Sequence, residues 1–164
     1  MQLKRYTDYA LRLLVYLGLH SERLVTIAEI AKAFGISKNH LMKVSKDLVA
    51  AGFVLSIPGK LGGLRLSRDP SALSIGRIVR QMEHRFELVE CLGTQSRCCI
   101  QPACRLKGML ELARDRFLEA LDPYTLADVL ENRGVLQRLM GDSGQTAERP
   151  PLALQRASSR RSLA

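Results

Sequence analysis

Four cysteines in one short stretch are the residues of this chain best suited to chemistry. They lie within fourteen residues, at Cys91, Cys98, Cys99 and Cys104. The first apolar segment lacks the small-residue cleavage site of a signal peptide, and no apolar run approaches the roughly 20 residues of a membrane span. We therefore expect a cytoplasmic protein, in which thiols stay reduced and serve as ligands or redox groups rather than as disulfides.

The spacing of these thiols bears on the metal that they would bind. Zinc usually takes four nitrogen or sulfur ligands at tight spacing, and Cys91-x6-Cys98-x5-Cys104 is not a C-x-x-C zinc knuckle. Iron–sulfur clusters accept wider spacing, because their ligands bind different corners of a larger core. Buried structural cysteines, or zinc with a histidine among its ligands, are the alternatives on spacing alone.

Positive charge is concentrated ahead of the cysteines. Residues 1–70 carry eleven Lys and Arg against five Asp and Glu, residues 71–140 carry ten against nine, and residues 141–164 carry four against two. This distribution indicates a phosphate-binding surface in the N-terminal segment. A solvated basic face would give the same composition.

Two short helices are predicted in the middle of this basic segment. The capping box Thr26-Ile27-Ala28-Glu29 opens the first, which Gly35 ends. Ser37 is expected to cap the second, which runs to Gly52. Short helices joined by a glycine-containing turn are typical of a helix-turn-helix.

The second of these helices has two distinct faces at about 100° per residue. Its apolar side is formed by Leu41, Val44, Leu48 and Ala51. The opposite side carries Lys38, Asn39, Lys43 and Lys46. Lysines suit phosphates and an amide suits base edges, so this helix is predicted to enter the major groove, with Asn39 as the best base reader.

A β-hairpin is predicted after this helix. Two β-prone runs, 53–57 and 64–66, flank the glycine-rich turn 58–63, and a hairpin in this position is a wing. Lys60 and Arg65 would place charge at its tip and stem. The residues that we expect to contact DNA are Ser37, Lys38, Asn39, His40, Lys43, Lys46, Lys60, Gly62, Gly63 and Arg65.

Further helices are predicted on either side of this unit. Thr7 is expected to cap a first helix, and others are expected over 75–84, over 105–121 and after Thr125. The long helix has one apolar stripe, which packs either on its own domain or on a partner protomer. The stripe consists of Leu106, Met109, Leu110, Ala113, Phe117 and Leu121.

The predicted fold is mostly α with a small β-hairpin wing. A winged helix-turn-helix DNA-binding domain occupies 1–70, and a cluster-binding loop with dimerisation helices occupies 71–140. Residues 141–164 are rich in Gln, Ser, Arg and Pro without periodicity, and are predicted to be a disordered tail.

Five segments resemble the iron–sulfur winged-helix repressors of the IscR/NsrR type, and are most similar to the nitric-oxide-sensing branch. They are MQLKRYTDYALRLLVYL, GISKNHLMKV, GKLGGLRL, ECLGTQSRCCIQPACRLK and LDPYTLAD. The resemblance covers about residues 1–130. It implies a homodimeric transcriptional repressor on a palindromic operator, which nitric oxide releases from double-stranded DNA.

The resemblance also implies a set of cluster ligands. Cys91, Cys98 and Cys104 match the three family cysteines, which leaves Cys99 as an extra thiol that could replace Cys98. Asp8 matches the family's fourth ligand, donated by the other protomer; without the resemblance it would be a plain helix-dipole carboxylate. Each protomer would hold one cluster.

The type of cluster and the signal have alternatives. Lys107 stands where 2Fe–2S members of the family carry a histidine, which favours 4Fe–4S and leaves 2Fe–2S possible. A sensor of iron–sulfur status or redox state and a DNA-binding protein with structural zinc are the other interpretations. No nucleophile elbow, phosphate loop or second cluster motif favours an enzyme.

Overall fold

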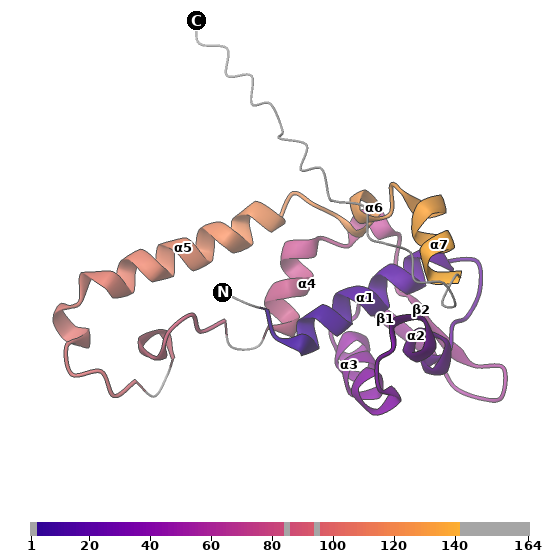
Figure 1. The fold of residues 1–164 in the computed structure, drawn as a ribbon, viewed down its shortest axis with the longest axis horizontal. Helices are drawn as coiled ribbons and strands as arrows, with labels where there is room; N and C mark the ends of the chain where they lie inside the picture. Colours follow the sequence, from indigo (N-terminus) through magenta and orange to yellow (C-terminus); the bar gives the residue numbers. More distant parts are fainter. Residues whose placement is uncertain (1–2, 84–85, 94–95, 142–164) are drawn as a thin grey trace, which may run out of the picture.

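The chain folds around its first helix, α1 (Arg5–Leu19), in a computed structural model that describes residues 3–83, 86–93 and 96–141. Figure 1 shows α1 in the middle of the body, with α3 and the strands on one side and α4 and α6 on the other. The predicted tail lies outside the described residues except for Gly141.

The order of elements confirms a mostly α fold with a small hairpin. After α1 come α2 (Ile27–Phe34), α3 (Lys38–Ala50), β1 (Val54–Ile57) and β2 (Gly63–Leu66). Then follow α4 (Ile75–Met82), α5 (Arg105–Leu121), α6 (Leu126–Val129) and α7 (Arg133–Gly141). The strands pair antiparallel, with Val54 opposite Leu66 and Ile57 opposite Gly63.

The signals at both ends of α2 are confirmed. The Thr26 hydroxyl accepts the backbone N–H of Glu29, and the Glu29 carboxylate accepts that of Thr26. Gly35 ends the helix at φ +63°, a left-handed conformation that favours glycine. Ser37 precedes α3 as predicted, but its side chain caps nothing.

The prediction that Thr7 caps the first helix is wrong. The helix begins at Arg5 with Lys4 at the N-cap, and Thr7 is fully buried inside its first turn. Glu83, just after α4, accepts the Lys4 N–H at 3.2 Å and the Thr7 hydroxyl proton. A residue 79 positions away thus supplies the cap, a contact that local sequence does not indicate.

One apolar core joins the helix-turn-helix to the elements that follow it. Each fully buried Leu or Ile contributes about 1.5–3 kcal/mol. The largest such side chains are Leu13, Leu14, Leu17, Leu19, Ile30, Leu41, Leu48, Leu73, Ile78 and Leu126. The Leu126 N–H donates to the Leu73 carbonyl at 2.8 Å, so the chain returns to this core after α5.

The long helix α5 leaves the body and carries the cysteine loop (residues 91–104) at its far end (Figure 1). Its near end is anchored, because Arg80 of α4 pairs with Asp122 and Phe86 stacks on Phe117 with ring centroids 5.5 Å apart. The Arg80 guanidinium lowers the pKa of Asp122 by hydrogen bonding. Among the described residues, no helix is long and apolar enough to cross a membrane.

Candidate DNA surface and cysteine loop

The face of α3 with the basic and amide side chains is open to solvent. Its apolar side is buried, with Leu41, Val44 and Leu48 at 0% exposure. Six of the ten predicted DNA contacts lie on the exposed remainder of the helix or just before it: Ser37, Lys38, Asn39, His40, Lys43 and Lys46. The helix therefore offers donors over its accessible surface while its other side is fixed in the core.

Two contacts from α1 hold α3 in place. The Tyr6 hydroxyl donates to Asp47 Oδ2 at 2.6 Å, and the Tyr9 ring lies 6.1 Å from the His40 ring. Burial and the Asp47 carboxylate raise the pKa of Tyr6 far above its usual value, so the phenol remains a donor at neutral pH. The Tyr6–Asp47 pair was not predicted from the sequence, because no local pattern relates positions 41 residues apart.

The wing has the predicted shape and depends on its glycines. Lys60 and Arg65 are exposed, and Leu61 at the tip is 91% exposed. A Cβ at Gly62 would lie 2.1 Å from the Ile57 carbonyl oxygen, and one at Gly63 would lie 2.9 Å from a backbone oxygen of the α1–α2 linker. Both predicted glycines are thus required by close backbone approach, and their contact with DNA stays a prediction.

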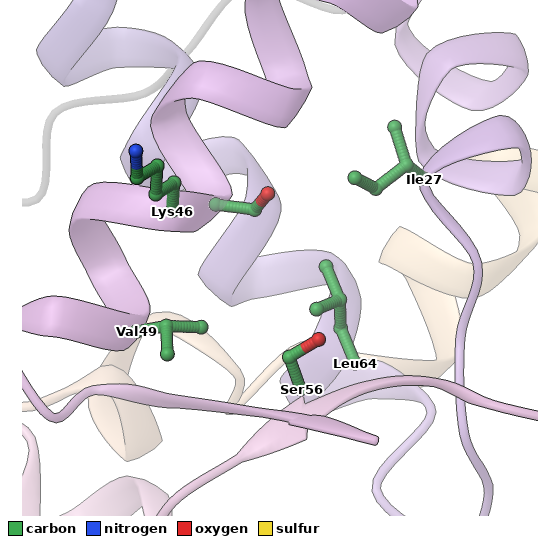
Figure 2. A pocket seen from close by; sticks show the side chains of 6 residues that line it. Ile27, Lys46, Val49, Ser56 and Leu64 are labelled. Atoms are coloured by element: carbon green, nitrogen blue, oxygen red, sulfur yellow. The ribbon is translucent and has the colours of Figure 1, made fainter. Parts of the chain in front are cut away.

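A cavity of about 280 Å³ separates the wing from α3. Figure 2 shows it lined by the side chains of Ile27, Lys46, Val49, Ser56 and Leu64, with the Lys46 ammonium directed away from Leu64. The lining is mostly apolar, and Lys46 is its only titratable member. The cavity offers no group for catalysis, whereas Lys46 faces the surrounding solvent.

The four cysteines are free thiols, as the sequence predicted. Cys91 and Cys104 are half-buried, and Cys98 and Cys99 are exposed. Cys104 directly precedes the 17-residue helix α5. The loop therefore presents soft sulfur ligands of the kind that iron–sulfur clusters take.

Glu90 closes the first half of the cysteine loop. Its side chain accepts the backbone N–H of Arg97 at 2.9 Å, and its carbonyl accepts the N–H of Gly93. Since Glu90 adjoins Cys91 and Arg97 adjoins Cys98, these bonds restrain two predicted ligands relative to each other. Sequence reasoning missed Glu90, although an acidic residue directly beside a cysteine was a visible signal.

The thiols are not yet gathered into a coordination site. Within residues 3–83, 86–93 and 96–141, no three His, Cys, Asp or Glu side chains lie close enough to hold a metal ion. The chemical type of these donors fits an iron–sulfur cluster, because the three predicted ligands are free thiols of one loop at a helix N-terminus. His20 instead lies beside Tyr16 and Glu22, away from any thiol.

Asp8 lies in the first turn of α1, half-exposed, as the sequence predicted. Arg12 holds its carboxylate through two contacts of 3.0 Å, Nε to Oδ1 and a terminal nitrogen to Oδ2. The structure does not bring Asp8 together with the cysteines of its own chain. Its role as a ligand for a second copy stays a prediction.

Comparison with known families identifies the group to which these features belong. A model of the Rrf2 family, described as an iron-dependent transcriptional regulator, matches residues 3–132. The chain belongs to the Rrf2 family. Membership accounts for the winged helix and the helices that follow it, since the match extends through α6.

Individual Rrf2-type relatives agree in sequence and fold. The HTH-type transcriptional regulator NsrR of Halalkalibacterium halodurans is 44% identical over 142 residues, 85% of this chain and 97% of that protein. The structure of IscR from T. potens matches with a TM-score of 0.64 at 27% identity, covering 80% of this chain and 88% of that one. CymR, the global cysteine regulator of B. subtilis, matches with the same TM-score at 28% identity, covering 80% and 98%.

The chain is therefore a winged-helix, DNA-binding transcriptional regulator and not an enzyme. The predicted fold class is confirmed by the structure and by its solved neighbours. The predicted ligand set, DNA contacts and domain boundaries stay predictions.

Proposed function

We propose that this protein is a homodimeric repressor that senses nitric oxide through an iron–sulfur cluster and releases its operator in response. The observation that carries the proposal is the loop of free thiols at the N-terminus of α5, in a chain 44% identical to a regulator named NsrR. NsrR-type repressors are nitric-oxide sensors, and the family description names iron. The protein would act in the cytoplasm, where its thiols stay reduced.

Cys91, Cys98 and Cys104 would hold the cluster, with Asp8 of the partner subunit as fourth ligand. A 4Fe–4S cluster fits best, because Lys107 replaces the histidine of 2Fe–2S relatives and pairs with Glu111 instead. When bound, the cluster would supply the iron that reacts with nitric oxide. A carboxylate is a harder ligand than thiolate, so the Asp8 position is the weakest protein contact of the set.

Arg12 has a defined part in this arrangement. It orients the Asp8 carboxylate, and it competes with any metal for the same oxygens. Ligation by Asp8 therefore requires that Arg12 release or share its partner. This competition would keep the fourth ligand exchangeable.

A second copy of the chain would cover the N-terminal half of α5. Leu106, Met109 and Leu112 are 57–63% exposed there, whereas Phe117 and Leu118 farther along pack against the body. An apolar helix face that its own chain leaves open is typical of a dimer interface. Two copies would present two α3 helices to half-sites about one helical turn apart.

An anaerobic titration tests the whole proposal. The full chain should purify coloured, with iron and acid-labile sulfide, and should bind its operator until nitric oxide is added. Mild oxidants at the same concentration should leave binding intact. Zinc without sulfide would overturn the cluster, and release by oxidants alone would indicate a redox sensor.

The role of Asp8 is tested in the same assay. Asp8→Ala should retain iron and sulfide through the thiols but change the rate of reaction with nitric oxide by about tenfold, since the exchangeable ligand is lost. Glu119→Gln is the matched control, because Glu119 is an exposed carboxylate near the C-terminal end of α5. This variant should react like wild type. Identical kinetics for wild type and Asp8→Ala would remove Asp8 from the ligand set.

A further inference from the structure

The first turn of α1 is held firmly to α4. The Thr7 side chain is fully buried, and its hydroxyl donates to Glu83, which is itself only 6% exposed. The same carboxylate accepts the Lys4 N–H and pairs with the Lys4 ammonium, Nζ to Oε1, at 3.2 Å. Glu83 directly follows the last residue of α4, so the first turn of α1 is bonded to the C-terminal end of that helix.

The same turn is bonded to the DNA-reading helix on its other side. Tyr6 reaches across to Asp47 of α3, with 2.6 Å between the hydroxyl and carboxylate oxygens. Asp47 directly follows Lys46, an exposed member of the predicted DNA surface. Asp8, the proposed trans ligand, is two residues beyond Tyr6 in the same helical turn.

These three consecutive residues have different partners because a helix turns by about 100° per residue. Thr7 faces inward to Glu83, Tyr6 faces α3, and Asp8 faces solvent beside Arg12. A helical turn is rigid, and a tyrosine side chain has only two main torsions. A displacement of the Asp8 end must therefore move the Tyr6 hydroxyl by a comparable amount.

Apolar packing between α1 and α3 would not by itself transmit such a displacement. Contacts among aliphatic side chains are non-directional and tolerate small sliding of one helix along another. A short hydrogen bond to a carboxylate is directional and weakens steeply when its geometry is lost. The bond from Tyr6 to Asp47 is a directional contact of this kind between the first turn of α1 and α3.

We infer that Tyr6 is a positioning residue that couples the Asp8 end of α1 to the orientation of α3 through its hydrogen bond to Asp47. The inference rests on the proposed ligation of the cluster by Asp8. With Asp8 engaged by the partner's cluster, the bond holds α3 in its operator-binding orientation. When Asp8 is released from the partner's cluster, the first turn of α1 is displaced. The Tyr6–Asp47 bond then moves α3 out of its operator-binding orientation.

The test separates coupling from folding by comparing two forms of each variant. Operator affinity is measured anaerobically for the cluster-loaded dimer and for the same protein after exposure to nitric oxide. Tyr6→Phe keeps the ring and loses only the hydroxyl. In this variant the ratio of operator affinity before nitric oxide to operator affinity after it should be smaller than in wild type by about fivefold or more, and so closer to one. Asp47→Asn should act in the same direction, and the double variant should add little beyond either single change.

Iron content and the rate of reaction with nitric oxide should stay at wild-type values in Tyr6→Phe, because the ligands are intact. Tyr124→Phe, at a residue that is 57% exposed in the turn after α5, is the matched control and should keep the wild-type ratio. A wild-type ratio in both Tyr6→Phe and Asp47→Asn would overturn the inference and leave the proposed function standing. A wild-type protein without a cluster, or with equal affinity in both forms, would overturn both.

Discussion

Cys98 and Cys99 are adjacent thiols in different backbone surroundings. The Cys98 N–H donates to the Ser96 hydroxyl at 3.3 Å, and its carbonyl accepts the N–H of Gln101. The backbone of Cys98 is thus restrained at both its N–H and its carbonyl group, within the turn that leads to Cys104. This backbone restraint favours Cys98 over Cys99 as the proposed ligand, because a backbone that is already restrained loses less conformational freedom on binding.

Replacing each thiol separately distinguishes them. Cys98→Ser should lose most of its iron, since only two thiolates of the set would remain to hold the cluster. Cys99→Ser should retain wild-type iron and sulfide, and it serves as the matched control one residue away. Iron and sulfide analysis of anaerobically purified protein makes the comparison; loss of iron in Cys99→Ser alone would exchange the two assignments.

The long helix α5 has two halves with different environments. Its C-terminal half is fixed to α4 by the Arg80–Asp122 pair and by the stacking of Phe86 on Phe117. Its N-terminal half extends past the body and leaves apolar side chains in solvent, which a partner is proposed to cover. The apolar stripe predicted from the sequence thus divides between side chains that pack within the chain and side chains that we propose a second copy covers.

A charge placed on the open half of α5 should prevent dimerisation. Met109→Glu would lose about 1.5 kcal/mol of apolar burial in each protomer, so the dimer dissociation constant should rise by roughly a hundredfold or more. Sedimentation velocity measures the change. Leu139→Glu, at a similarly exposed position on α7, is the control and should remain dimeric. An unaffected dimer in Met109→Glu would place the interface elsewhere.

The whole molecule keeps its excess positive charge at one end. The winged helix-turn-helix segment holds most of the net charge of +9, and its exposed lysines surround α3 and the wing. The cysteine loop lies beyond α5 on another part of the molecule, so the proposed cluster site and the predicted DNA surface of one chain are spatially separate (Figure 1). The proposed signal would therefore pass through packed elements.

The contribution of one lysine to this electrostatic surface can be measured directly. Lys46→Ala removes two proposed phosphate contacts per dimer, so the slope of log affinity against log salt should become shallower by about 1.8. Binding should weaken on all sequences alike. Arg77→Ala, an exposed charge on α4 away from α3, controls for net charge and should leave the slope unchanged. An unchanged slope in Lys46→Ala would remove that residue from the DNA surface.

Local signals were sufficient for most of the secondary structure. The bounds of α5, the capping box of α2 and the hairpin follow from periodicity, helix caps and glycines, all of which act over a few residues. The same reasoning placed α4 up to position 84, whereas the helix ends at Met82 and His84 lies outside the described residues. It indicated no separate helix at 133–141, where α7 forms and its Arg133 and Gln137 donate to the Leu19 carbonyl.

Residue types and short spacings were enough to predict a basic winged helix followed by a loop of reduced thiols, because helix capping, amphipathic periodicity and ligand chemistry are local properties. The pairs Tyr6–Asp47 and Thr7–Glu83 join positions 41 and 76 residues apart, and no local pattern specifies them. They exist because packing brings α3 and α4 against the same turn of α1. Folding thus places the proposed ligand Asp8 in a turn that is bonded both to α3, the predicted DNA-reading helix, and to Glu83 at the end of α4.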